Sequence, residues 1–303
     1  MGNAYGRAAR PFLPCGLRLI VYVDSLGDHN PLVKQIRRAV ARGTLTDDGY
    51  AVAEGPHLLE EAIEAQCEIR AVIVSESARP GMMDRFPRLP EPRQVSEKTF
   101  RTLSSTETPQ GVIALVKPPA AELAEILGGT TLSPDTLIAI LDGVQDPGNA
   151  GAIVRVAEAF GATGAIFLKG SVDPFHPRTL RGSAGSAFRL PILAHVVDFA
   201  AELDAPVDVS KSLRIYAAMP RAAACIELRE ADFTQPCAIA IGGEGRGIGE
   251  CMAARAIAVH IPTRNVESLN AAVAAGVLFY EARRQRDLFP AGREIIEQRP
   301  SES

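Results

Sequence analysis

The feature that most constrains the fold is a series of short segments in the second half of the chain that are apolar at almost every position. These segments are LIAILDGV (137–144), GAIFLKG (164–170), LRIYAAM (213–219), CAIAIGGEG (237–245) and AIAVHIP (256–262). A strand with one face in water alternates apolar and polar residues, so strands that are apolar throughout are buried on both faces. Helical segments between them supply the cover. We therefore predict an α/β domain with a parallel sheet and helices on both faces.

The first half of the chain alternates in a similar way and ends at a proline-rich break. Helices are predicted at residues 31–43, 56–66 and 96–103, strands at 50–55, 69–77 and 111–117, and an irregular stretch at 80–94. Lys117-Pro118-Pro119 then interrupts regular structure, because proline lacks the amide hydrogen that helices and sheets use. We predict a smaller α/β domain at 29–117, a linker at 118–135 and the larger domain at 136–288, with a flexible extension at 1–28 and a tail at 289–303.

The composition argues against several classes of protein. With 303 residues, 47% of them apolar, the chain is long enough for two packed domains, and its net charge of −4 argues against non-specific coating of nucleic acid. The five cysteines form no C-x-x-C pair and no cluster with histidine, which argues against a metal site and favours a reducing cytoplasm. No apolar run reaches the roughly 18 residues that a membrane span needs. The three arginines before Asp24 are assigned to the flexible extension rather than to a targeting segment.

A glycine-rich loop follows the predicted strand that begins at Cys237. Its sequence IAIGGEGRGIG, residues 239–249, does not keep the G-x-G-x-x-G spacing of dinucleotide-binding loops, and the chain has no G-K-[S/T] phosphate loop. NAD and ATP are therefore disfavoured as ligands. Glycines without side chains still allow a ligand to approach the backbone closely. By itself the loop is compatible with a simple turn or with a binding site.

Two further loops follow predicted strands, at the edge of the sheet where α/β proteins place their ligands. The first, DPGNAGAIVR, residues 146–155, leads into a helix predicted from about Ala150. Ile153 belongs to the apolar stripe of this helix, and Arg155 lies about 200° around the helix from it, able to point toward a ligand. The other, IPTRNVESLN, residues 261–270, leads into a helix of small residues that Ser268 is expected to cap.

Together the three loops resemble the motifs of the SpoU (TrmH-like) family of RNA ribose 2′-O-methyltransferases, part of the SPOUT superfamily. D-P-x-N-x-G-x-x-x-R at 146–155 resembles the first motif, G-x-E-G-x-G at 242–247 the second, and I-P followed by S-L-N at 261–262 and 268–270 the third. The chain has Thr263 where the family usually has methionine, and its loop from Ile261 to Leu269 is one residue shorter than is common. Residues 30–117 are similar to the small substrate-binding domain of many members, whose fold is shared with ribosomal proteins that grip bent RNA.

The resemblance implies a trefoil-knotted parallel sheet, S-adenosylmethionine as cofactor, and a homodimer that forms through the knotted domain and completes the active site. It also implies that Arg155 activates a ribose 2′-hydroxyl. Because a guanidinium keeps its proton, we expect Arg155 to fix the neighbouring phosphate instead of acting as a base. The expected catalytic residues are Arg155, Asn149, Glu244, Ser268 and Asn270, and the expected cofactor-binding residues are Gly242, Gly243, Ala218, Ile261 and Leu269.

Two basic segments are expected to contact the RNA. The polar face of the helix at 31–42 carries Lys34, Arg37 and Arg38, and the segment 175–192 carries Arg178, Arg181 and Ser183, together with Ser186 and Arg189. Large-subunit ribosomal RNA is the first expected substrate and transfer RNA the second. Two alternatives remain: an RNA-binding protein that has kept the fold but lost catalysis, and a related knotted enzyme that methylates a base.

Overall fold

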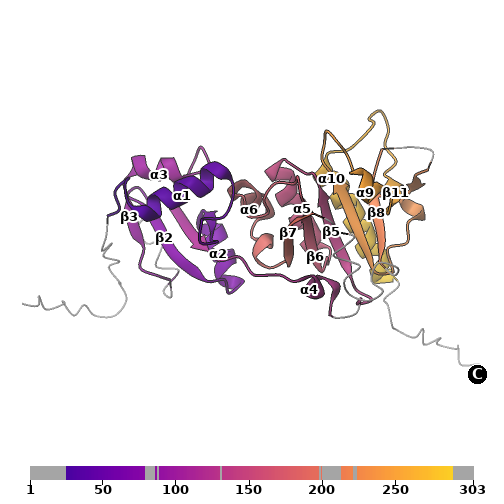
Figure 1. The fold of residues 1–303 in the computed structure, drawn as a ribbon, viewed down its shortest axis with the longest axis horizontal. Coiled ribbons are helices and arrows are strands. Elements are labelled where there is room, and N and C mark those ends of the chain that lie inside the picture. The colour runs from indigo at the N-terminus through magenta and orange to yellow at the C-terminus, as the bar shows by residue number, and fades with distance from the viewer. Residues whose placement is uncertain are drawn as a thin grey trace, which may run out of the picture.

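The computed structural model describes residues 25–78, 86, 89–129, 132–197, 199, 213–220 and 224–288. Two sheets lie side by side along the long axis of the molecule (Figure 1), one in an N-terminal domain that ends with β4 and one in a C-terminal domain that begins with β5. The predicted tail at 289–303 and residues 1–24 of the predicted extension lie outside the described residues.

The N-terminal domain contains a mixed four-stranded sheet in the order β1-β4-β2-β3. β4 is antiparallel to β1 and β2, and β3 is parallel to β2. β3 was not expected, because it lies at the end of the proline-rich stretch. The elements are α1 (Pro31–Arg42), β1 (Ala51–Glu54), α2 (Pro56–Glu64), β2 (Ile69–Ser75), β3 (Arg93–Val95), α3 (Glu97–Leu103) and β4 (Val112–Val116).

Helix α1 shows why the predicted helices form where they do. The Asn30 side chain accepts a hydrogen bond from the Leu32 amide (2.9 Å), and Pro31 occupies the first helical position, where no amide hydrogen is needed. Gly43 ends the helix in the left-handed conformation, with a φ of 67°. The buried side of α1 packs with α3 on one face of the sheet, while α2 covers the other face.

The C-terminal domain contains a seven-stranded sheet in the order β7-β6-β5-β10-β8-β11-β9. Every neighbouring pair in this sheet is parallel, which confirms the prediction. The edge strands β7 and β9 were not predicted, because His195 interrupts the apolar run of β7 and β9 has only two residues. The strands are β5 (Leu137–Asp142), β6 (Gly164–Leu168), β7 (Ile192–Val196), β8 (Arg214–Ala218), β9 (Ile226–Glu227), β10 (Cys237–Gly242) and β11 (Ile257–His260).

Helices cover both faces of this sheet. Leu137, Ala139 and Leu141 of β5 point to the face covered by α5 and α10, while Ile138 and Ile140 point to the face covered by α4 and α9. This explains why the strand is apolar at consecutive positions. The helical elements are α4 (Leu123–Leu127), α5 (Pro147–Ala159), α6 (Pro177–Ser183), η2 (Ser186–Phe188), η3 (Leu228–Glu230), α9 (Glu250–Ala253) and α10 (Ala271–Leu288), of which α4 lies within the predicted linker.

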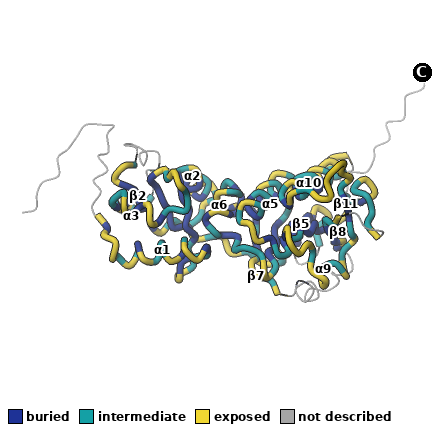
Figure 2. The backbone as a smooth tube through the Cα atoms, turned by 90° about the horizontal axis from the view of Figure 1, so that it is seen from above, coloured by how far each residue is buried: buried dark blue, intermediate teal, exposed yellow. Residues whose placement is uncertain are grey.

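The two domains meet at α6 and η2, which lie between the two sheets (Figure 1). The Arg189 guanidinium binds Glu158 of its own domain (2.7 and 3.0 Å) and Glu61 of the N-terminal domain. Arg181 donates to the Ser105 hydroxyl (3.1 Å). One cluster of buried apolar side chains continues from the N-terminal domain into the C-terminal domain, and buried residues run through this junction in Figure 2.

Two glycines allow this close approach of the domains. A Cβ on Gly43 would collide with the His176 imidazole, and a Cβ on Gly185 would collide with the Glu61 side chain. Both glycines also have a positive φ, 67° and 89°, which other residues adopt only with strain. The junction therefore depends on glycine at both positions.

His176 makes the junction sensitive to acid. Its Nδ1 accepts a hydrogen bond from the Arg178 amide (3.0 Å), and burial, followed by the charge of Arg178, lowers its pKa below the ordinary 6.5. Above pH 6.5 the ring is neutral in both folded and unfolded chains. As the pH falls below 6.5, His176 of the unfolded chain binds a proton before His176 of the folded chain does. The free energy of unfolding therefore decreases as the pH falls from 6.5 to the lower pKa of the folded state.

We therefore expect the wild type to lose more stability between pH 7.5 and pH 5.5 than a His176→Asn variant. Asparagine keeps a side-chain acceptor for the Arg178 amide but does not titrate. Urea denaturation at the two pH values measures the difference. Equal losses in the two proteins would contradict the role given to His176.

Candidate active site

The first candidate loop joins β5 to α5. The Asp146 side chain accepts a hydrogen bond from the Asn149 amide (2.7 Å), and Pro147 is the first residue of the helix. The helix therefore begins three residues earlier than the predicted Ala150. This start places Asn149 in the first turn, at the carboxyl end of β5.

Three expected catalytic residues meet above this edge of the sheet. Asn149 donates from Nδ2 to Glu244 Oε1 (2.6 Å), and Asn270 donates from Nδ2 to Asn149 Oδ1 (3.0 Å). Asn270 Nδ2 also lies 3.4 Å from the same Glu244 oxygen. These hydrogen bonds join residues 95 and 121 positions apart in the sequence, so the fold brings all three loops to one place.

The start of α10 explains the position of Asn270. Its Oδ1 accepts from the amides of Ala272 (2.9 Å) and Val273 (3.3 Å), which leaves Nδ2 to face Asn149. Asn270 is therefore the residue that caps α10. The prediction that Ser268 caps this helix is wrong, because the helix begins at Ala271 and Ser268 lies three residues before it in an exposed loop.

The glycine-rich loop is held against the first loop by contacts that exclude side chains. A Cβ on Gly243 would collide with the Gly143 carbonyl, and one on Gly242 would collide with the backbone of Gly247. The Gly243 amide donates to the Asp142 carbonyl (3.0 Å), and the Gly249 amide donates to the Asp142 carboxylate (2.7 Å). Close backbone packing, not a phosphate cradle, is thus the reason for glycine here.

A pocket of about 370 Å³ lies between these two loops and the start of α10. Its lining includes Asn149 and Glu244 of the hydrogen-bonded group. The remaining lining residues are Gly143, Val144, Gln145, Asp146, Gly243, Gly245, Arg246 and Ala271. The pocket thus opens at the carboxyl edge of the parallel sheet, where ligands bind in α/β proteins.

The expected cofactor-binding residues lie along the same edge. Ala218, Gly242 and Ile261 end or directly follow β8, β10 and β11, and Leu269 lies just before α10. The backbone N–H and C=O groups of Ile261 and Leu269 form no hydrogen bond with another described residue, although both residues are half-buried. Such groups normally have a partner, so these backbone groups fit a polar ligand. The partly buried Ile248 and Met219 add apolar surface nearby.

Arg155 lies on the exposed side of α5. Its neighbours on the helix, Ile153, Val154 and Ala157, are buried. The burial of Ile153 agrees with its predicted place in the apolar stripe. Its side chain forms no hydrogen bond or ion pair with another described residue, and it is not part of the pocket lining. A cation that is fixed by its helix but unpaired is available to bind an anionic group.

The comparisons with known proteins match this geometry. The family model of the SpoU rRNA methylase family matches residues 136–280, and that of the MRM3-like substrate binding domain matches residues 30–114. The 23S rRNA (guanosine-2′-O-)-methyltransferase RlmB of Ralstonia nicotianae is 34% identical over 202 residues, which cover 63% of this chain and 76% of the relative. The chain belongs to the SpoU rRNA methylase family.

Other members of the family are similar over most of the chain. The 23S rRNA (guanosine(2553)-2′-O)-methyltransferase RlmP of Bacillus subtilis is 28% identical over 258 residues, covering 84% of this chain and 96% of the relative. The crystal structure of the SpoU methyltransferase AviRb from Streptomyces viridochromogenes in complex with AdoMet has a TM-score of 0.73 at 26% identity, covering 88% of this chain and 100% of the other. The resemblance expected from the three loop motifs is thereby confirmed.

The structure separates the residues expected to contact RNA into two groups. Lys34 and Arg178 are exposed, and neither side chain has a hydrogen bond or ion pair to a described residue. Arg37 instead binds Thr102 (2.9 Å) and Asp28 (3.4 Å), and Arg38 lies 3.3 Å from Asp47. These two arginines are therefore already paired within the N-terminal domain.

The segment 175–192 is mostly a structural junction. Ser183 is fully buried and donates to the Leu180 carbonyl (2.9 Å), so the prediction that it contacts RNA is wrong. Ser186 is also buried, and Arg189 and Arg181 bind across the domain boundary. Two of the arginines in this segment therefore join the domains, while Arg178 remains exposed. Sequence alone could not distinguish a junction arginine from one that binds RNA.

Sequence reasoning gave no role to Asp142 or to Asp146, although Asp146 begins the first loop motif. Asp142 holds the glycine-rich loop, and it is the only polar side chain in the segment LIAILDGV. Asp146 caps α5, and Asp-Pro before a helix is a recognisable start signal. Within the described part of the chain, no helix is long and apolar enough to cross a membrane, and no three His, Cys, Asp or Glu side chains are grouped to hold a metal.

Proposed function

We propose that this protein transfers a methyl group from S-adenosylmethionine to a ribose 2′-hydroxyl in structured RNA. The observation that carries the proposal is the hydrogen-bonded group of Asn149, Glu244 and Asn270, which joins all three motif loops beside the pocket. A protein that only binds RNA has no need for this arrangement. The names of RlmP and RlmB favour 23S ribosomal RNA as the substrate, with transfer RNA as the alternative.

The cofactor, when bound, supplies an electron-poor sulfonium methyl group. The backbone at Gly242, Ile261 and Leu269 would hold it, with Ala218 and Gly243 beside it, because half-buried backbone groups and apolar side chains meet there. The AdoMet-bound AviRb structure, which covers 88% of this chain, supports the assignment.

The side chains around the pocket have separate roles in the proposed reaction. Arg155 binds the phosphate next to the target ribose and stabilises the negative charge that develops on the 2′-oxygen. The proton of the 2′-hydroxyl passes to that phosphate or to a water molecule, because the guanidinium already holds its own protons. Asn149, Glu244 and Asn270 orient the nucleotide, and the exposed Ser268 hydroxyl reaches it from the loop before α10. Holding the reacting atoms in place supplies much of the rate.

The C-terminal domain is proposed to be a trefoil-knotted homodimer. After β11 the chain crosses β8 and β10 to place α10 against α5 and β10, which supports threading through an earlier loop. On α10, Val273 and Tyr280 are 53% and 56% exposed on one face, with open space at Gly276 between them. A second copy that packs on this face would explain the exposed apolar side chains. Because Arg155 is outside the pocket lining of its own chain, the dimer completes the active site.

The proposed organisation is an RNA substrate-binding domain at 29–117 with a ribosomal-protein-like fold, a linker at 118–135 and the methyltransferase domain at 136–288. The match of residues 30–114 to a substrate-binding family model supports the first of these. The reaction is placed in the cytoplasm, where bacterial ribosomal RNA is made.

The test uses purified protein, radiolabelled S-adenosylmethionine and separate 23S ribosomal and transfer RNA from cells that lack the gene. Label is expected in 2′-O-methylnucleosides after digestion of the 23S RNA. Label in a base would overturn the ribose assignment, and label only in transfer RNA would change the substrate. Cofactor binding without label in any RNA would favour the RNA-binding alternative.

A further inference from the structure

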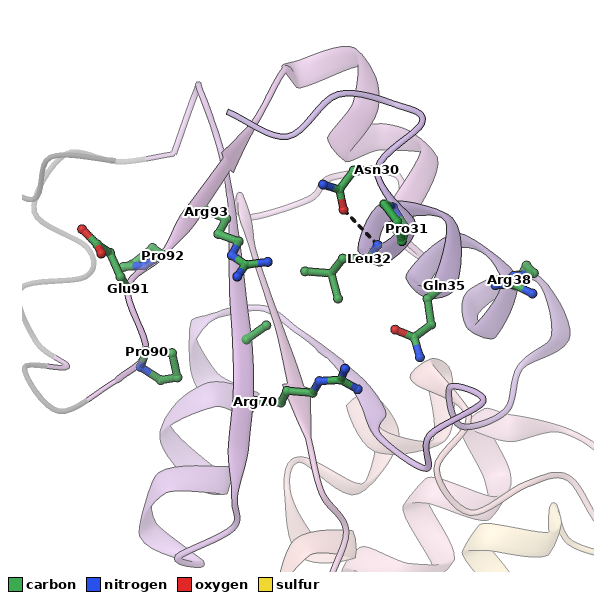
Figure 3. A pocket seen from close by; sticks show the side chains of 11 residues that line it. Asn30, Pro31, Leu32, Gln35, Arg38, Arg70, Pro90, Glu91, Pro92 and Arg93 are labelled. Carbon is green, nitrogen blue, oxygen red and sulfur yellow. Dashed lines mark hydrogen bonds between the residues drawn. The ribbon is translucent and has the colours of Figure 1, made fainter. Parts of the chain in front are cut away.

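A second pocket, about twice as large as the one at the active site, lies in the N-terminal domain. It is a groove of about 760 Å³ between the start of α1 and the β3 side of the N-terminal sheet (Figure 3). β3 pairs with β2 only at Ile73–Ser75, and the prolines at positions 90 and 92 cannot donate to an extended ladder. Arg70 and Ala71 of β2 are therefore left at an open edge, and this edge forms the floor of the groove.

The groove is lined by more basic than acidic residues, and Arg93 is the arginine of the lining that has no acidic partner among the described residues. Its lining contains three arginines, Arg38, Arg70 and Arg93, and one acidic residue, Glu91. In Figure 3 the guanidinium groups of Arg93, from β3, and Arg70, from β2, point into the groove. Arg93 forms no ion pair with another described residue, so its charge is available.

The other two arginines, Arg38 and Arg70, form ion pairs with neighbouring acidic residues. Asp48 binds Arg70, whose guanidinium also lies 5.1 Å from the centre of the Tyr50 ring, and Asp47 lies 3.3 Å from Arg38. Both acids belong to the turn after α1 and neither lines the groove. They fix the direction of the arginines without filling the space between them.

The uncharged groups of the groove also favour an anion. The Asn30 Oδ1 is occupied by the Leu32 amide, so its Nδ2 remains as a donor facing the groove. Leu32 and Ala71 provide an apolar surface between the donors. Planar arginine forks with an additional amide donor suit the oxygens of phosphate, and the apolar surface suits the sugar beside it.

We propose that this groove binds the phosphate backbone of the substrate RNA at a distance from the methylated nucleotide. The inference rests on the proposed function, because it assigns the ligand from the RNA substrate. The groove shares no lining residue with the active-site pocket, and it lies on the α1 side of the sheet, opposite the α2 side that meets the C-terminal domain. It therefore contacts a part of a large RNA that a short RNA fragment does not contain.

The test compares Arg93→Gln and the double variant Arg70→Gln/Arg93→Gln with Arg101→Gln. Arg101 lies on α3 of the same domain and is 73% exposed, so its replacement removes the same charge elsewhere. Binding of a 23S ribosomal RNA transcript is measured across a range of salt concentrations. Arg93→Gln is expected to weaken binding about tenfold and the double variant further, with the salt slope smaller by about one for each lost phosphate contact. Arg93→Lys is expected to keep the salt slope.

Unchanged cofactor affinity and thermal midpoint in the variants show that folding is intact. RNA affinities and salt slopes equal to those of Arg101→Gln would overturn the inference. So would binding of AMP at the groove without any effect of the variants on RNA, because the site would then serve a small phosphate compound. RNA binding is measured without methyl transfer. A failure of the methylation assay can therefore be distinguished from a failure of the groove to bind RNA.

Discussion

Replacing Arg155 with alanine is expected to lower the rate of methyl transfer by about 100- to 1000-fold, the usual cost of removing one donor that stabilises a developing oxyanion. Arg155 is exposed and unpaired among the described residues, so its loss disturbs no contact within the fold. Cofactor affinity and the thermal midpoint are therefore expected to stay unchanged. Single-turnover assays with saturating RNA measure the chemical step separately from binding.

An Arg155→Lys variant distinguishes the two roles proposed for the guanidinium. Lysine keeps the positive charge but not the planar fork, so an intermediate rate supports two-point binding of the phosphate. Arg283→Ala, on the exposed surface of α10, serves as the control for loss of a surface arginine. A wild-type rate in Arg155→Ala would remove this residue from the mechanism.

Replacing Arg286 with alanine is expected to lower the free energy of unfolding by about 3 kcal/mol, because four backbone carbonyls, two of them partly buried, lose a charged donor. The guanidinium donates to the backbone carbonyls of Phe233 (2.9 Å) and Asp135 (2.7 Å). It also donates to those of Thr136 (3.0 Å) and Gln235 (3.1 Å). It thus ties the end of α10 to the segments that enter β5 and β10.

The expected loss corresponds to a fall in the thermal midpoint of roughly 6–12 °C for a domain of this size. Arg283→Ala is the matched control, since among the described residues Arg283 pairs only with the exposed Asp287 on the same helix, and this pair contributes at most about 0.5 kcal/mol. Urea denaturation followed by circular dichroism compares the two variants. Equal stability in both would show that the four carbonyls find other partners.

The hydrophobic pattern was sufficient to predict the main strands of both sheets, because burial on two faces leaves a clear signal in consecutive residues. The pattern was weaker at the sheet edges. β9 has only two residues, and His195 interrupts the short apolar run of β7, so neither was recognised as a strand. The start of α5 was predicted three residues too late and the cap of α10 two residues too early, because Asp146 and Asn270 cap these helices.

Within the site, the loop motifs identified the residues that meet, but not their contacts. The hydrogen bonds among Asn149, Glu244 and Asn270 depend on side-chain directions that only the folded chain fixes. The acceptors of Arg286 could not be predicted either, because they are backbone carbonyls with no sequence signature. Basic residues were the least informative, since Arg37 and Arg189 pair with acidic side chains of the protein itself.

The contact between the two domains limits how freely such domains can be exchanged between relatives. Gly43 and Gly185 lie on opposite sides of the junction, and each leaves room for a side chain of the other domain, His176 or Glu61. In a chimera whose N-terminal domain lacks Gly43 and Glu61, the residue in place of Gly43 would collide with His176. Arg189 would also lose its hydrogen bond to the Glu61 carboxylate. A working chimera would therefore have to exchange α6 and η2 together with the N-terminal domain. The segment that must be exchanged as one piece thus extends past the linker into the C-terminal domain.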